Sequence, residues 1–315
     1  MSSAASRIRA LRKLAWVCVA VVLAITSLSA FIRLSRTGLG CEPWPECYAQ
    51  RAGSAGAAVA EKPDTAVTAA RIAHRVVAVA ALLLVISMVM TAFASTPVMR
   101  REGRMALGLL VLAVLLAVLG RWSAGARVPA VILGNLLGGF AMFALSWRLA
   151  RSVGQPPAAG GARDRLATWA CIGAGLLVLQ IVLGGLVSAG HAGLSCPRLL
   201  ACDASAGSWS LLNPFHGAAT AGGDPTNSAG SLVHLLHRAG TVLLAIVLLP
   251  LGAAAWRRGR RAGAAVIALL LLQGALGVAL VTGGLPLPVA LAHNTTAALL
   301  LVSVLELAGR RRAAG

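Results

Sequence analysis

The chain has 315 residues, of which 58% are hydrophobic and only 12% are charged, and its formal net charge is +19. A soluble domain carries about 25% charged residues, so this composition excludes an ordinary soluble globule and favours a protein whose solvent is the bilayer. The basic residues stand in short clusters between apolar segments, which argues against a nucleic-acid-binding surface despite the positive charge.

Apolar segments of roughly 20 residues, each with at most one charged residue, follow one another along the chain. Segments of this length cross ~30 Å of hydrocarbon as α-helices. The predicted spans are, in chain order, 14–32, 74–93, 105–120, 129–147, 167–188, 232–251, 264–282 and 287–307. The pattern predicts an all-α integral membrane protein with eight transmembrane helices.

Strong basic clusters lie before the first span, after every second span and at the C-terminus. By the positive-inside rule, both termini are expected in the cytoplasm, with the chain in a bacterial inner membrane. The first span could instead be a cleaved signal peptide, since a basic segment precedes it and the small residues Ser29 and Ala30 lie near its end. Its apolar run of 19 residues is long for such a peptide, so we expect it to be retained.

The two long outward loops, 33–73 and 189–231, contain the same sequence motif. Each has Gly-Leu-x-Cys, five further residues and a second Cys, and a His-Arg pair follows at the mouth of the next helix. The cysteine pairs are Cys41/Cys47 and Cys196/Cys202, and the His-Arg pairs are His74-Arg75 and His237-Arg238.

A repeat of four helices crosses the membrane an even number of times, so both copies share one orientation. We therefore expect two four-helix bundles related by a pseudo-twofold axis along the membrane normal, with a site in or between them. The N-terminal repeat is predicted at 1–155 and the C-terminal repeat at 156–315, with a Pro- and Gly-rich linker at 152–162.

The loop cysteines lie on the predicted oxidising side, where each pair could close a small disulfide loop. Such a disulfide could stiffen its loop or be redox-active, and the sequence leaves both readings open. A zinc site is disfavoured, because the spacing of five residues is wrong and no second Cys-x-x-Cys occurs. Cys18 and Cys171 lie inside spans and are expected to be small packing residues.

Histidines inside the spans carry the strongest functional signal, because an ionisable group in a membrane is costly. His237 and His293 lie five to six residues into spans that both enter from the outer face, at a depth of ~8–9 Å. Two imidazoles at one depth in one bundle could bind a haem iron from both sides, or could merely bond neighbouring helices. Arg238 could meet a haem propionate, and His234, one turn outward, is expected to support the site without binding iron. His191 and His216 are expected to be surface residues.

These features together resemble the haem A synthase family of oxidase-assembly proteins, over nearly the whole chain. The matching segments are Arg33-Leu-Ser-Arg-Thr-Gly-Leu-Gly-Cys41-Glu-Pro-Trp44-Pro45-Glu-Cys47, Ala73-His74-Arg75, the second Cys pair, His234-Leu-Leu-His237-Arg238 and Ala292-His293-Asn294. The resemblance implies an eight-helix bundle that oxidises the C8 methyl of haem O to a formyl group. It further implies that His237 and His293 hold haem b in the C-terminal half, and that His74 is a ligand of the substrate haem in the N-terminal half.

The N-terminal half departs from the family pattern at two positions. Arg71 stands where the family has a glutamate, three residues before His74, and Asn135 stands where the family has a second histidine. Asn offers iron only an amide oxygen. The half could be a degraded copy, or a pocket with one axial histidine and an open face, as oxygen chemistry at haem requires.

The favoured function is haem A synthase, an oxidoreductase that acts on haem O for cytochrome oxidase assembly. The alternative is a family member that binds haem b without this reaction, as an electron-transfer or haem-handling assembly factor, and Arg71 and Asn135 favour it. A transporter with parallel repeats is disfavoured, since matched mid-span breaks are missing. The expected partners are haem O, membrane lipid, haem O synthase and an electron donor, and an oligomer is compatible with the sequence.

Overall fold

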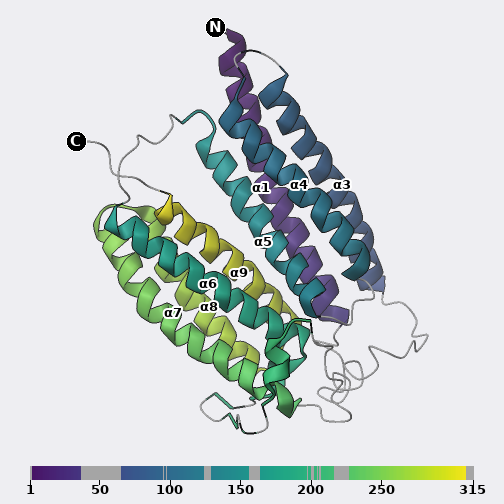
Figure 1. Ribbon diagram of the computed structural model, residues 1–315, viewed down its shortest axis with the longest axis vertical. Coiled ribbons are helices and arrows are strands. Elements are labelled where there is room, and N and C mark those ends of the chain that lie inside the picture. Colours follow the sequence, from purple (N-terminus) through teal and green to yellow (C-terminus); the bar gives the residue numbers. More distant parts are fainter. Residues whose placement is uncertain are drawn as a thin grey trace.

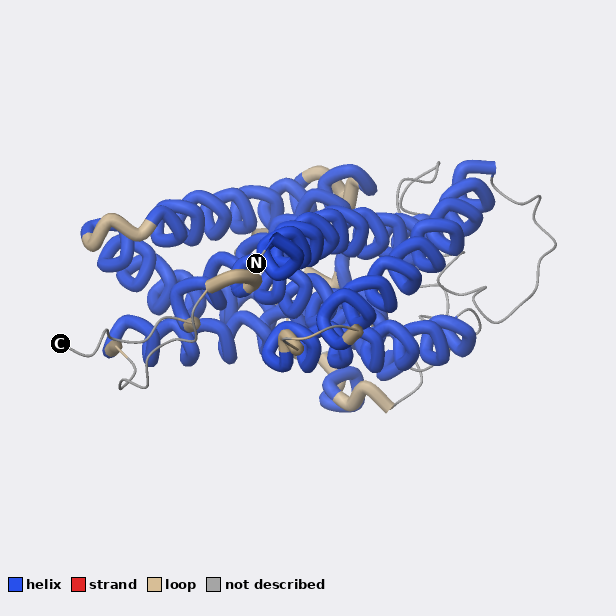
Figure 2. Tube along the Cα trace, turned by 90° about the horizontal axis from the view of Figure 1, so that it is seen from above, coloured by secondary structure: helices blue, strands red, loops and turns tan. Residues whose placement is uncertain are grey.

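The computed structural model of the protein describes residues 2–36, 65–94, 96, 98–123, 129–155, 164–196, 198–199, 202–203, 205, 207–215 and 227–309. All the long elements in these ranges are α-helices, and no strand occurs among the described residues (Figures 1 and 2). The helices are α1 (Ser2–Arg36), α3 (Thr65–Phe93), α4 (Arg100–Ser123), α5 (Pro129–Ser152), α6 (Arg165–Ala189), α7 (Ser231–Arg257), α8 (Arg261–Thr282) and α9 (Leu287–Ala308). Three short 3-10 helices, η1 (Ala192–Leu194), η2 (Trp209–Leu212) and η3 (Ser228–Gly230), lie in the second long loop.

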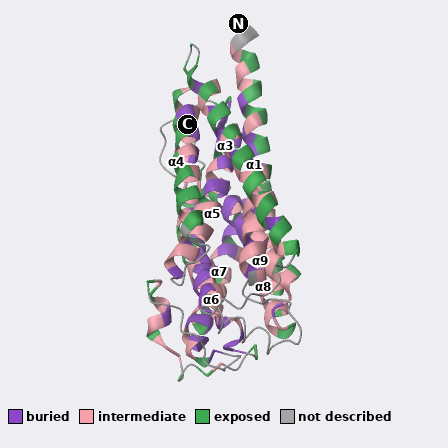
Figure 3. Cartoon of the chain, turned by 90° about the vertical axis from the view of Figure 1, so that its right-hand side faces the viewer, coloured by how far each residue is buried: buried purple, intermediate pink, exposed green. Residues whose placement is uncertain are grey.

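The described chain has 8 helices long and apolar enough to cross a membrane, which confirms the predicted multi-pass all-α class. Each predicted span falls inside one of these helices. The helices extend beyond the predicted spans because polar residues at their ends, such as Arg100 and Arg101, continue the helical hydrogen bonding outside the apolar run. Exposed residues face outward and buried residues face the interior of the bundles (Figure 3).

The helices form two rings of four. In the second ring α6 contacts α7, α7 contacts α8, α8 contacts α9, and α9 closes on α6. The first ring repeats this order with α1, α3, α4 and α5 (Figure 1). Consequently α7 and α9 occupy opposite corners of one bundle, and α3 and α5 occupy opposite corners of the other.

The two bundles meet through α1, α5, α6 and α9. Ser27 and Thr295 approach within 3.4 Å between their hydroxyl oxygens and join α1 to α9. At one end of the molecule, Arg151 of α5 pairs with Glu306 of α9 at 3.0 Å. The order of helix contacts is the same in both bundles, as expected after a gene duplication. The pseudo-twofold axis and the boundary between 1–155 and 156–315 stay predictions.

Helix α1 is 35 residues long and packs into the first bundle along its length. Leu11 and Cys18 are fully buried, which agrees with a packing role for Cys18. The Arg7 guanidinium donates to the Thr91 carbonyl oxygen at 3.1 Å, and Arg12 donates to the Val153 carbonyl oxygen at 2.8 Å. These cations lie near the C-terminal ends of α3 and α5, where the helix dipole favours positive charge.

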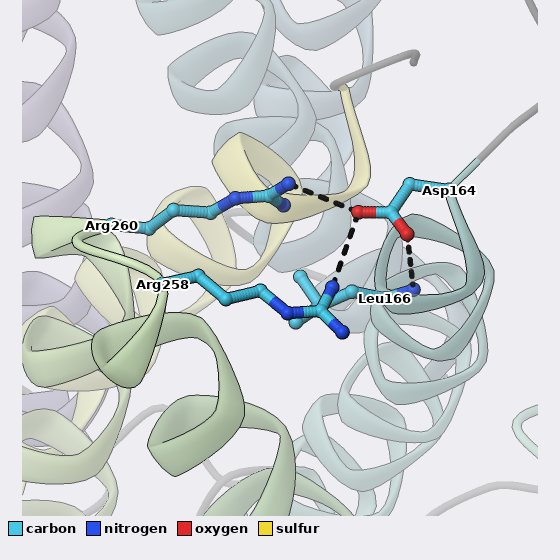
Figure 4. Close-up of polar contacts among 4 residues, drawn as sticks. All are labelled: Asp164, Leu166, Arg258 and Arg260. Atoms are coloured by element: carbon cyan, nitrogen blue, oxygen red, sulfur yellow. Dashed lines mark hydrogen bonds and ion pairs between the residues drawn. The ribbon is translucent and has the colours of Figure 1, made fainter.

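At the end of the molecule where α1 begins, Asp164 holds parts of the second bundle together. Asp164 is the N-cap of α6 (Figure 4). Its carboxylate accepts from the Leu166 backbone N–H and pairs with Arg260 at 3.0 Å and Arg258 at 3.4 Å. Desolvation raises the pKa of Asp164, but the Leu166 hydrogen bond and the two guanidinium groups outweigh it and hold that pKa below its ordinary value. The start of α6 is thereby tied to the turn between α7 and α8.

The second long loop folds over the opposite end of α6 and α7. Cys196 and Cys202 form a disulfide with a Cα–Cα distance of 4.8 Å, which confirms the predicted pair. The Asn227 side chain donates to the Gly190 carbonyl oxygen at 2.6 Å, and the Asn227 carbonyl oxygen accepts from Ser195 at 2.6 Å. Cys41 and Cys47 lie outside the described residues.

Candidate functional site

The two histidines predicted to hold haem lie at matching heights in the second bundle. His237 is six residues after Ser231, where α7 begins, and His293 is six residues after Leu287, where α9 begins. Both helices begin at the same end of the bundle, so both imidazoles lie ~9 Å along their helices. Because α7 and α9 occupy opposite corners, the two histidines lie on helices that face each other across the bundle.

The His237 side chain is held by α6. The Gln180 side-chain nitrogen lies 3.1 Å from His237 Nδ1 and also donates to the His237 carbonyl oxygen at 2.6 Å. The same nitrogen is 2.7 Å from the Thr241 hydroxyl, one turn along α7. A Cβ atom on Gly184 would lie 2.9 Å from His237 Cε1, so the glycine provides the space that the ring occupies.

The His293 side chain lies against α8. A Cβ atom on Gly277 would lie 3.6 Å from His293 Cε1. His293 Nδ1 is buried and has no hydrogen-bond partner, and the Gln273 side-chain oxygen is in the same state. A buried nitrogen without a partner is unfavourable by about 1–3 kcal/mol, which a ligand could offset.

The chemistry of these residues fits a haem. His237 and His293 lie at one depth on helices at opposite corners of the bundle, and imidazole is an axial ligand of haem iron. Within the described residues, no group of three or more His, Cys, Asp or Glu side chains could hold a metal ion.

His234 and Arg238 flank His237 on α7. His234 is buried, and its Nδ1 has no hydrogen-bond partner. Arg238 donates to the carbonyl oxygens of Arg198 at 2.7 Å, Leu199 at 3.1 Å and Cys196. The guanidinium thus fastens the disulfide loop to α7, and its predicted contact with a haem propionate stays a prediction.

In the first bundle, His74 and Asn135 lie on α3 and α5, the helices at opposite corners, as His237 and His293 do in the second bundle. His74 is half-buried on α3, and Asn135 is half-buried on α5, six residues after Pro129. Helix α3 does extend to Arg71, so Arg71 and His74 lie one turn apart as expected. Arg71 is exposed, which favours a side chain that extends to the interface over one that anchors a substrate inside the bundle. The described helices carry carboxylates only at Glu102 and Glu306, far along the chain from these positions.

Comparison with known proteins identifies the family of the chain. The model of the cytochrome oxidase assembly protein family (COX15-CtaA) matches residues 12–305. The chain belongs to this family. A heme A synthase from Shewanella oneidensis is 29% identical over 317 residues, which cover 90% of this chain and 92% of that protein. The match spans both bundles, so both halves of this cytochrome oxidase assembly protein are covered.

One expectation for this family member was wrong. His191 was expected on the surface, but it is half-buried at the end of α6 and adopts a left-handed backbone with φ 53°. Burial lowers the pKa of His191. His216, the other histidine expected on the surface, lies outside the described residues.

Sequence analysis missed Gln180 and the glycines beside the two histidines. A signal was available, because Gln180 and Gln273 are polar residues inside apolar spans and each has a glycine four residues later. The contact of these helices with His237 and His293 could not be read from the sequence, because it depends on which helices become neighbours.

Proposed function

We propose that this family member is a haem A synthase, which oxidises the C8 methyl of haem O to a formyl group. The observation that carries the proposal is the pair of imidazoles, His237 and His293, at one depth on opposite corners of the second bundle. The family match and the similar heme A synthase support it. The chain would act in the bacterial inner membrane with both termini in the cytoplasm.

Each bundle would have its own role. In the second, His237 and His293 would hold haem b, which supplies electron transfer when bound. The bond from Gln180 would keep the His237 ring oriented, and the surrounding apolar side chains would exclude water. Arg238 and His234 would support that site, with Arg238 holding the loop above it.

The first bundle would bind haem O as substrate, with His74 as a ligand of the substrate iron. Asn135 on the opposite corner is a poor iron ligand, which would leave that face accessible for oxygen chemistry. Haem O synthase and an electron donor would be the partners that deliver substrate and exchange electrons.

The test is the haem content of cells that lack the protein. Haem extracts separated by chromatography should show loss of haem A and accumulation of haem O, and a plasmid copy should restore haem A. A His74→Ala copy should fail to restore it. Unchanged haem A in the deletion strain would refute the proposed reaction.

A second candidate function is haem b binding without this oxidation, as an electron-transfer or haem-handling assembly factor. Exposed Arg71 and the replacement of a ligand by Asn135 favour it, because both changes fall in the proposed substrate half. This alternative predicts a purified protein with a haem b spectrum, a deletion strain with normal haem A, and reduced assembly of the oxidase.

A further inference from the structure

Each of the two proposed haem-binding imidazoles lies against a neighbouring helix that carries a Gln and, four residues later, a Gly. His237 lies against Gln180 and Gly184 of α6, and His293 lies against Gln273 and Gly277 of α8. Residues four apart share one face of a helix. A glycine there leaves room beside the helix backbone for the imidazole of the neighbouring helix.

The Gln-Gly pair on α6 makes more contacts with its histidine than the pair on α8 does. Gln180 is 8% exposed, and an uncharged but polar amide inside a membrane helix needs partners. It finds them on α7 alone, at His237 Nδ1, the His237 carbonyl oxygen and Thr241. Gly240 makes this approach feasible, since a Cβ atom there would lie only 2.2 Å from the Gln180 side-chain oxygen.

We infer that Gln180 is the positioning residue of His237, and that Gly184 leaves the space in which the His237 imidazole turns toward a shared haem. The inference rests on the proposed function. An imidazole that binds metal through one ring nitrogen is oriented by the hydrogen bond of the other. In the structure the Gln180 side-chain nitrogen is the donor, and it meets His237 Nδ1, the His237 carbonyl oxygen and the Thr241 hydroxyl together.

The first experiment compares Gln180→Leu with Gln180→Glu in the purified full-length protein. Gln180→Leu should lose several-fold in the ratio of haem to protein and should alter the low-spin electron paramagnetic resonance signal. Gln180→Glu should retain haem, because a carboxylate in place of the amide donor can accept a hydrogen from Nδ1–H, the tautomer that leaves Nε2 free for iron. Its haem should have a more negative midpoint potential, because a carboxylate makes the imidazole a stronger electron donor. A residue that only filled space would not produce opposite effects in these two variants.

The second experiment uses glycines as matched pairs. Gly184→Ala places a methyl group 2.9 Å from the His237 ring and should lower the haem content several-fold. Gly277→Ala makes an ordinary contact at 3.6 Å and should be mild, whereas the larger Gly277→Leu should not be tolerated. Gly175→Ala on α6 and Gly274→Ala on α8 are controls, since a Cβ atom at either position meets nothing within 4 Å.

The outcomes separate this inference from the proposed function. A wild-type protein without low-spin haem b, or one whose haem survives His237→Ala, overturns both. A wild-type spectrum that depends on His237, but with unchanged potentials in both Gln180 variants and full haem content in Gly184→Ala, overturns the positioning inference alone. If Gln180→Leu does not fold, Gln180→Glu and Gly184→Ala still decide the question.

Discussion

At the scale of single residues, the proposed function depends on the imidazoles of His237 and His293 inside an apolar bundle. Replacing either His237 or His293 with Ala should abolish or severely reduce a low-spin b-type spectrum, because six-coordinate iron needs both axial nitrogens. Optical spectra of purified variants, normalised to protein, provide the measurement. His191→Ala is a suitable control, since His191 lies in the loop beyond α6. Wild-type spectra in both site variants would show that these histidines only join helices.

A substitution at Arg71 tests whether this residue anchors the substrate in the N-terminal half. Because its side chain is exposed, we expect Arg71→Ala to leave binding and turnover of haem O nearly unchanged. An anchoring role would instead weaken substrate binding by about 1.5–3 kcal/mol, the range for a hydrogen bond to a charged group. Titration of haem O into the purified variant separates these results. Raised turnover in Arg71→Glu combined with Asn135→His would mark this half as a decayed copy of the family site.

At the scale of elements, close helix contacts depend on small residues, as is general in membranes. A Cβ atom on Gly263 would lie 2.5 Å from both the Gly252 oxygen and the Trp256 nitrogen, and backbone atoms cannot move aside cheaply. Gly263→Ala should therefore separate α7 from α8 and destabilise the protein by roughly 1–3 kcal/mol. Thermal unfolding in detergent measures this, with Gly274→Ala as the control on the same helix. Equal melting temperatures for the two variants would contradict the close approach.

The loop disulfides are a second prediction at this scale. Cys196–Cys202 should be bonded in protein from oxidising conditions, and we expect the same of Cys41–Cys47 from its equal spacing. Peptide mass mapping without reductant gives the answer. Free thiols at all four positions would overturn both the pairing and the outward placement of these loops. Arg238→Gln should loosen the second loop without breaking its disulfide, because the guanidinium donates only to loop carbonyls.

At the scale of the whole molecule, charged residues fasten the end that is predicted to be cytoplasmic. The pKa of Asp164 is depressed in the folded state, so its stabilisation is present above the unfolded pKa of about 3.9 and is lost as pH falls through the lower folded value. Asp164→Asn keeps a good N-cap and removes only the ion pairs, so it should flatten this acid loss. Asp164→Ala also removes the cap and should cost about 0.5–2 kcal/mol at neutral pH. Melting temperatures between pH 3 and pH 7 would test both, and an unchanged acid dependence in Asp164→Asn would argue against the ion pairs.

The sequence by itself determined the class of the molecule and its helices. Hydrophobic length decides whether a segment crosses a bilayer, and this is a local property, so all eight spans were predictable. The candidate ligands were also readable, because an ionisable residue such as His293 within an apolar run is unusual. Only the tertiary structure decided that α7 and α9 lie on a diagonal, that Gln180 holds His237, and that Arg238 faces a loop. Those relations depend on which helices become neighbours and on how closely glycines let them approach, and neither is encoded in local periodicity.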